Sequence, residues 1–234
     1  MKFICLHGFG VRGNFWDPLI PELSKLSEKN VIAPDLDFST IDSAINSSRN
    51  SIINNQDNVS VIIGHSLGAV LALRQELVIL DNENIYLILL GCGLPMKMNS
   101  IVIAITRMIM KYGYLLPDHF WQPRFFSPIT PQDIQDKFFS KVVKESNTFI
   151  NELTSKNNYL LHFLENIERS FPRTLFITGT KDRLTTTERT VALANKLNAT
   201  FMSIDNAGHN DLIYSESVRK KVVKEIISFL GINL

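Results

Sequence analysis

Residues 59–63 form an apolar run rich in β-branched side chains, which predicts a strand. This run ends at the pentapeptide Gly64-His65-Ser66-Leu67-Gly68. The apolar, alanine-containing run that comes next predicts a helix. A turn this sharp between a strand and a helix strains its central residue and exposes it at the tip, so its neighbours must carry almost no side chain. Gly64, Gly68 and Ala69 meet that requirement. Ser66 is therefore a candidate nucleophile.

A serine hydroxyl is a poor nucleophile unless a nearby base takes its proton. That base works best when a carboxylate holds it in the correct tautomer. Asp182 and His209 each follow the end of a strand-like run. The carboxyl ends of parallel strands meet at one edge of a sheet, where catalytic groups gather. We therefore expect Asp182 to orient His209, and His209 to take the proton of Ser66.

Simpler interpretations of the same residues stay open. Asp182 is also suited to cap the helix that starts near Thr186, and His209 is also explained as a surface loop histidine. Asp205 and Asp211 are alternative partners for His209, but they lie too close to it in sequence to orient a ring aimed at Ser66.

Negative charge that develops on a substrate carbonyl needs fixed hydrogen-bond donors. The first predicted strand ends in His7-Gly8-Phe9-Gly10, a turn that can present a backbone amide to the site. We expect the amides of Phe9 and Leu67 to form an oxyanion hole. The candidate substrate-contacting residues are Gly8, Gly10, Trp16 and His65, while His7 and His65 are also explained as structural neighbours of their turns.

Six short apolar runs read as strands, at residues 3–6, 31–33, 59–63, 85–90, 174–178 and 200–204. Between most of them lie amphipathic stretches that predict helices, such as 18–26, 69–80 and 187–197, and a last helix is expected over 215–230. Strands that alternate with helices predict an α/β fold with a mainly parallel sheet covered on both faces.

One interval breaks this rhythm. Residues 94–168 contain apolar and helical patterns divided by prolines, with no strand-like run. The interval is too long for a loop. We expect residues 1–93 and 169–234 to form the core, and residues 94–168 to form a helical lid inserted above it.

Four motifs in this order resemble the α/β-hydrolase superfamily: the HGFG turn, the GHSLG elbow, the sequence Gly-Thr-Lys before Asp182, and Gly208-His209. The resemblance spans nearly the whole chain. It implies a serine nucleophile, an acyl-enzyme step and a helical cap where the chain has its long interval. Because the chain begins at the HG strand, the family sheet is expected to be shortened to about six strands. The segment 33–39 also lacks the family's D-x-P-G-x-G turn.

A competing interpretation comes from Gly8, Gly10 and Gly13, which match a G-x-G-x-x-G pattern after a strand, with Asp35 at the end of the next one. That is the fingerprint of a dinucleotide-binding oxidoreductase. Here Asp17 and Pro18 signal a helix start that is too late to aim its N-terminus at a pyrophosphate. A receptor that keeps the fold and binds without turnover is a further alternative.

Composition limits the function classes. The chain has 234 residues, 45% of them hydrophobic, and a net charge of +1 without a basic block, so nucleic acid is not an expected partner. Cys5 and Cys92 are expected to be buried free thiols. No signal peptide or membrane-length apolar run is apparent, which favours a cytoplasmic protein. The chemistry requires no cofactor or metal.

The expected reaction is hydrolysis of a carboxylic ester, by a carboxylesterase-like serine hydrolase acting on a small-molecule substrate. The lid is rich in apolar and aromatic side chains, which suggests an apolar pocket for a small to medium acyl group. A thioesterase, or a hydrolase of carrier-protein-linked or CoA-linked esters, is the alternative within the same fold, because lid lysines and Arg124 suit an acidic carrier.

Overall fold

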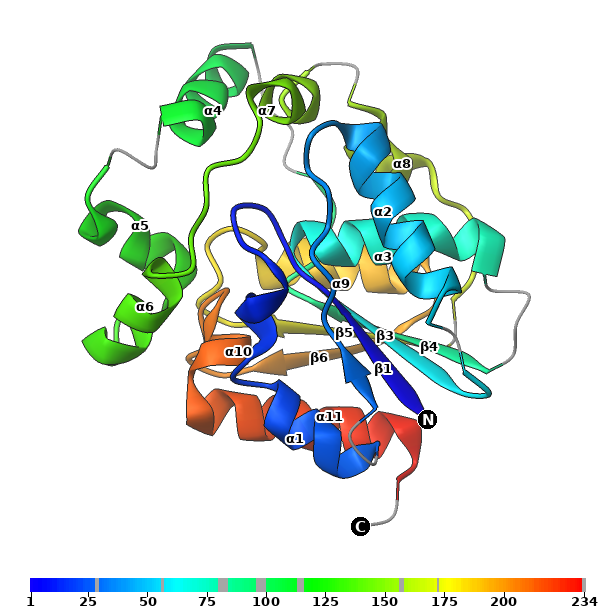
Figure 1. Cartoon of the computed structure of the whole chain (residues 1–234). Coiled ribbons are helices and arrows are strands. Elements are labelled where there is room, and N and C mark those ends of the chain that lie inside the picture. The colour runs from blue at the N-terminus through cyan, green and yellow to red at the C-terminus, as the bar shows by residue number, and fades with distance from the viewer. Residues whose placement is uncertain are drawn as a thin grey trace.

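The computed structural model describes residues 1–27, 30–55, 57–79, 84–95, 100–112, 116–155, 158–171 and 173–232. Within these ranges the chain forms one six-stranded sheet covered by helices on both faces (Figure 1). No helix in the described ranges is both long and apolar enough to cross a membrane.

The sheet confirms the predicted parallel α/β architecture. Its strand order is β2-β1-β3-β4-β5-β6, and every pairing between neighbours is parallel. The strands are β1 (Lys2–Leu6), β2 (Val31–Ile32), β3 (Ser60–His65), β4 (Ile85–Leu90), β5 (Thr174–Gly179) and β6 (Thr200–Ile204). Strands β3 and β5 are buried along their whole length, as expected for β-branched and apolar runs in a sheet with two covered faces.

Alternate residues of each strand belong to two separate cores. On one face, Ile4 and Leu6 pack with α2 (Ile41–Ile53), α3 (Leu67–Ile79) and α9 (Thr187–Lys196). On the other, Phe3 and Cys5 pack with the 3-10 helix η1 (Gly13–Trp16), α1 (Ile20–Leu26), α10 (Asp211–Tyr214) and α11 (Glu216–Leu230). Cys5 and Cys92 are free and buried. Leu80, the last residue of the helix predicted over 69–80, lies outside the described residues.

The first helix starts later than Asp17 and Pro18 suggested. Phe15 and Trp16 are buried against the sheet within η1, so the chain first makes a short 3-10 turn there. The α-helix begins at Ile20, with Pro21 in its first turn, where a missing amide hydrogen removes no hydrogen bond.

Between β4 and β5 the described residues form helices and no strand. These helices are α4 (Ser100–Tyr112), α5 (Asp118–Phe125), α6 (Gln132–Phe139), α7 (Asn147–Leu153) and α8 (Tyr159–Asn166). Helices α4 to α7 lie beyond the carboxyl ends of the strands (Figure 1). Helix α8 instead buries Leu160 and Leu164 in the same core as α3. The interval predicted as a lid therefore ends with a helix that belongs to the layer covering the sheet. We use the word cap for residues 116–155.

Candidate active site

Ser66 occupies the tip of a strained turn between β3 and α3. Its φ is +54°, in the left-handed region that side chains rarely adopt. Positions 64 and 68 on either side must be glycine, because a side chain at either would clash with the backbone. A Cβ on Gly64 would lie 2.4 Å from Ala69 Cα, and one on Gly68 would lie 2.2 Å from the carbonyl oxygen of Leu6. The sharp turn expected from this pentapeptide is therefore present, and Ser66 is less buried than either neighbour.

Asp182 and His209 meet at the carboxyl ends of β5 and β6. His209 Nδ1 donates to Asp182 Oδ2 over 2.7 Å, and both side chains are almost completely buried. The other carboxylate oxygen accepts the amides of Leu184 and Thr185, each at 2.8 Å. Asp182 Oδ1 is thus held by the amides of its own loop, and Asp182 Oδ2 orients the imidazole of His209.

The remaining ring nitrogen of His209 is the one that could take a proton. With the hydrogen on Nδ1, Nε2 has a free lone pair. His209 Nε2 is buried and has no hydrogen-bond partner within the described part of the chain. Buried polar atoms are normally satisfied, so one left open at a strand edge is suited to a reacting group.

The structure adds Gly91, which the sequence reasoning missed. This residue follows β4 with a φ of +58°, and a Cβ there would lie 2.8 Å from His209 Cε1 and 2.9 Å from His209 Nδ1. The His209–Asp182 pair fits only because position 91 has no side chain. The available signal was a glycine directly after a buried strand at the catalytic edge of the sheet.

The turn after β1 lies directly beside Ser66. A Cβ on Gly8 would lie 3.1 Å from Ser66 Cβ and 3.6 Å from the amide nitrogen of Leu67. Among the described residues, neither the amide of Phe9 nor that of Leu67 donates a hydrogen bond. The two amides expected to form an oxyanion hole are therefore available, and the turn that carries one of them approaches the other.

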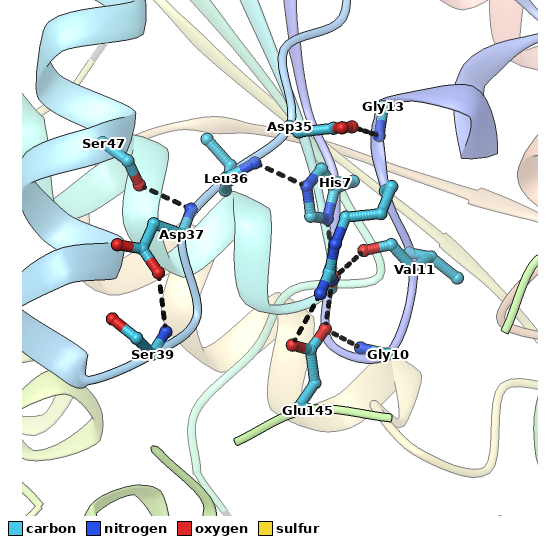
Figure 2. A network of polar contacts seen from close by, with 12 residues as sticks. His7, Gly10, Val11, Gly13, Asp35, Leu36, Asp37, Ser39, Ser47 and Glu145 are labelled. Carbon is cyan, nitrogen blue, oxygen red and sulfur yellow. Dashed lines mark hydrogen bonds and ion pairs between the residues drawn. The ribbon is translucent and has the colours of Figure 1, made fainter. Parts of the chain in front are cut away.

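His7 holds this turn in place (Figure 2). The amide of Leu36 donates to His7 Nε2 over 2.9 Å, so the ring hydrogen is on Nδ1, which donates to the carbonyl oxygen of Gly8 over 2.9 Å. Burial disfavours the charged ring and lowers the pKa of His7 to about 4. His7 is thus a neutral link between the turn and the loop after β2.

Two of the candidate substrate-contacting residues lie in the core. Trp16 is fully buried beside Phe15 and the ring of His65, so its side chain is not exposed to a substrate. The side chain of His65 is also buried, and its Nε2 donates to the carbonyl oxygen of His209 over 3.1 Å. Both side chains support the site from within the protein.

The alternative acidic partners of His209 are placed elsewhere. Asp205 is exposed. Asp211 is buried and accepts hydrogen bonds from the amides of Gly208 and Ser127 and from the hydroxyl of Thr130. Burial raises the pKa of Asp211 above its usual value. This carboxylate connects the His209 loop to the cap.

The glycine pattern at residues 8–13 is occupied by contacts within the protein. The amide of Gly10 donates to Glu145 Oε1 over 3.1 Å, and that of Gly13 donates to Asp35 Oδ1 over 2.6 Å (Figure 2). A dinucleotide site needs such amides for a pyrophosphate and the acidic residue for a ribose. Here Gly10, Gly13 and Asp35 are used in the packing of the first turn. In the described ranges, no group of three or more His, Cys, Asp or Glu side chains is arranged to hold a metal ion.

Comparisons with known proteins agree with this fold. Residues 3–225 match the model of the alpha/beta hydrolase family. No curated protein sequence matches the chain. Similar solved structures include a hydrolase from Oleispira antarctica, 19% identical with a TM-score of 0.78, which covers 100% of this chain and 92% of the other.

Two further solved structures share the fold. A thermophilic esterase from Thermogutta terrifontis is 17% identical with a TM-score of 0.72, over 99% of this chain and 89% of the other. The 2-hydroxy-6-oxo-6-phenylhexa-2,4-dienoate hydrolase from Rhodococcus sp. strain RHA1 is 19% identical with a TM-score of 0.71, over 98% and 90%.

Proposed function

The chain belongs to the alpha/beta hydrolase family, and on that premise we propose that it is a serine hydrolase that cleaves carboxylic esters with Ser66, His209 and Asp182. One observation carries the proposal above the others. The buried His209–Asp182 pair leaves Nε2 without a partner among the described residues, as a base at the same sheet edge as the strained turn of Ser66.

The reaction we propose has two halves. His209 Nε2 takes the proton of Ser66 as the serine oxygen attacks the ester carbonyl, and Asp182 stabilises the imidazolium that forms. The amides of Phe9 and Leu67 hold the resulting oxyanion. The imidazolium then gives its proton to the departing alcohol, which leaves an acyl group on Ser66. Water, deprotonated by the same imidazole, releases the acid and restores the serine.

The acyl group that we propose is small to medium in size and apolar. Phe9 is half-buried in the turn whose Gly8 lies beside Ser66, and it stacks on Phe149 of α7, with ring centroids 6.1 Å apart. Phe38 also packs against Phe149, with ring centroids 5.0 Å apart. The half-buried Phe9 supports an apolar wall where the cap meets the turn, with the buried Phe149 and Phe38 as its packing. A thioester, or an ester on CoA or a carrier protein, is the alternative substrate, since the same attack applies to it.

We further propose that the cap, together with α4, acts as a lid over this site, and that the protein acts in the cytoplasm. Two buried free thiols are compatible with a reducing compartment.

The test is pre-steady-state hydrolysis of p-nitrophenyl butyrate. We expect a burst of p-nitrophenol of about one equivalent per chain, which is the kinetic sign of an acyl-enzyme. Ser66→Ala should abolish both the burst and turnover. A receptor built on this fold would instead bind the ester or its acid stoichiometrically, without release of p-nitrophenol. Turnover that survives Ser66→Ala would exclude the proposed mechanism.

A further inference from the structure

A buried carboxylate from the cap reaches the turn that carries Phe9. Glu145 lies in the segment between α6 and α7, and its side chain is only 2% exposed. Its Oε1 accepts hydrogen bonds from the amide of Gly10 over 3.1 Å and from Arg12 Nη1 over 2.6 Å, while Oε2 accepts one from Arg12 Nη2 over 3.2 Å (Figure 2). The amide of Val143 donates to the carbonyl oxygen of Gly10 over 2.8 Å. The cap segment therefore binds both polar atoms of the Gly10 backbone.

These contacts determine how the amide of Phe9 points. A trans peptide unit is planar, so its carbonyl and its amide point in opposite directions. His7 Nδ1 holds the carbonyl of Gly8, which shares a peptide plane with the amide of Phe9. Glu145 holds the amide of Gly10, which shares the next plane with the carbonyl of Phe9. His7 therefore fixes the plane that contains the amide of Phe9, and Glu145 fixes the next plane, so that the turn cannot rotate to redirect this amide.

The conformation that is held in this way favours glycine. Gly10 has a φ of +77°. Without contacts to hold it, a glycine at this position could adopt many other backbone conformations, and the turn would change with it. His7 holds the peptide plane before Phe9, and Glu145 holds the plane after it. Of these two residues, only Glu145 belongs to the cap. We propose that Glu145, paired with Arg12, is a positioning residue for the oxyanion hole. This inference rests on the proposed function, because it assigns a task to the amide of Phe9.

Arg12 and Glu145 have different parts in this pair. The side chain of Arg12 is 32% exposed, so solvent can hydrate it when Glu145 is removed. Glu145 has no such access, and its carboxylate is held by the bidentate contact with the guanidinium. Arg12 therefore keeps the carboxylate in place, and the carboxylate holds Gly10.

The cap does not depend on Glu145 for its attachment. Glu152 Oε2 accepts the amide of Ile41 over 2.7 Å, and the hydroxyl of Ser146 donates to the carbonyl oxygen of Ser39 over 2.6 Å. Both contacts join the cap to the region around α2 and leave the turn at residues 8–12 untouched. Glu152→Gln is therefore a matched control, since it is the same substitution at another cap carboxylate that accepts a backbone amide.

The test compares Glu145→Gln, Glu145→Ala and Glu152→Gln in p-nitrophenyl butyrate hydrolysis and in inhibition by a trifluoromethyl ketone. The ketone forms a tetrahedral adduct on the serine, so its affinity reports the oxyanion hole. Loss of a whole oxyanion donor lowers kcat by roughly 10²–10³, and a misdirected donor should approach that value. We expect kcat in Glu145→Ala to fall at least about tenfold, with KM changed by less than about twofold, and ketone affinity to fall in parallel with kcat.

Glu145→Gln keeps an acceptor for Gly10 and should be intermediate, while Glu152→Gln should match the wild type. Hydrogen exchange of Gly10 should be faster in Glu145→Ala and unchanged in Glu152→Gln. Ser66-dependent hydrolysis with wild-type kcat and ketone affinity in Glu145→Ala would overturn the positioning role alone. Hydrolysis that does not depend on Ser66 would instead overturn the proposed function on which this positioning role rests.

Discussion

The rings of His65 and His209 lie 4.6 Å apart, and His65 Nε2 donates to the backbone carbonyl of His209 over 3.1 Å. The residue before the candidate nucleophile thus holds the loop of the candidate base. Burial and the neighbouring His209 keep the pKa of His65 well below its usual value, so the contact is made by a neutral ring. Strand β3 therefore determines the positions of both Ser66 and His209.

Replacement of His65 by Phe keeps an aromatic ring in the core and removes only its hydrogen bond. The carbonyl of His209 would be left without this donor, which should lower the free energy of unfolding by about 1–3 kcal/mol. We expect kcat to fall about tenfold with little change in KM, because the base is misplaced while the acyl pocket is intact. Urea unfolding and steady-state kinetics check this, and a wild-type kcat in His65→Phe would remove His65 from the support of the site.

Asp182→Asn should leave the fold intact and nearly abolish turnover. The amide can donate to Nδ1 and thereby favour the wrong tautomer of His209, an effect of roughly 10⁴ in kcat in serine hydrolases. Asp205→Asn is the control, since Asp205 is exposed and lies in the turn after β6, close to His209 in sequence. The measurement is kcat for both variants with circular dichroism as the check on folding. Equal activity of the two variants would show that Asp182 has no special part.

Gly91→Ala should displace His209. The new Cβ would lie 2.8 Å from His209 Cε1, and the backbone has a φ of +58°. Gly231→Ala is a matched control, because Gly231 has a φ of +64° and no described residue lies within 4 Å of its Cβ position. Both variants should lose about 1 kcal/mol of stability from the strained backbone. Gly91→Ala alone should lose most of its kcat, and comparable activity in the two would mean that position 91 need not be free of a side chain.

The stability of the protein should depend on pH through His7. The pKa of His7 is about 4 in the folded chain against 6.5 for the free group. Below pH 6.5 the unfolded chain therefore binds a proton that the folded chain rejects, so this stabilisation is present above pH 6.5 and lost as pH falls towards 4. Its full size is about 3 kcal/mol.

The comparison of wild type with His7→Asn isolates this term, since other titrating groups are common to both. The difference in their free energies of unfolding, measured in urea, should shrink by about 3 kcal/mol between pH 7 and pH 4. A difference that stays constant over this range would show that His7 is not held neutral in the fold.

The parts of the site that follow local rules could be predicted from the sequence. The glycines around Ser66 and the positions of Asp182 and His209 after strands are short-range signals, because a sharp turn and a strand end are each defined within a few residues. The parallel sheet of six strands, covered on both faces, followed in the same way from the alternation of strands and helices.

Contacts between distant segments could not be predicted. Glu145 approaches Gly10 across 135 positions, and no periodicity indicates which carboxylate of the cap turns inward. The burial of Trp16 depends on η1, a 3-10 turn that local propensity does not distinguish from a helix start. Helix α8 has the apolar pattern of a lid helix, and only its packing against α3 assigns it to the core layer.

The central claim is that Ser66 becomes acylated. The most direct measurement is peptide mapping by mass spectrometry after the protein is mixed with p-nitrophenyl butyrate and quenched in acid during the burst. We predict one butyryl group on the peptide that contains Ser66, absent in Ser66→Ala and strongly reduced in a variant with His209 replaced by Ala. Release of p-nitrophenol with no acyl group on Ser66, or with the acyl group on another residue, would contradict the account.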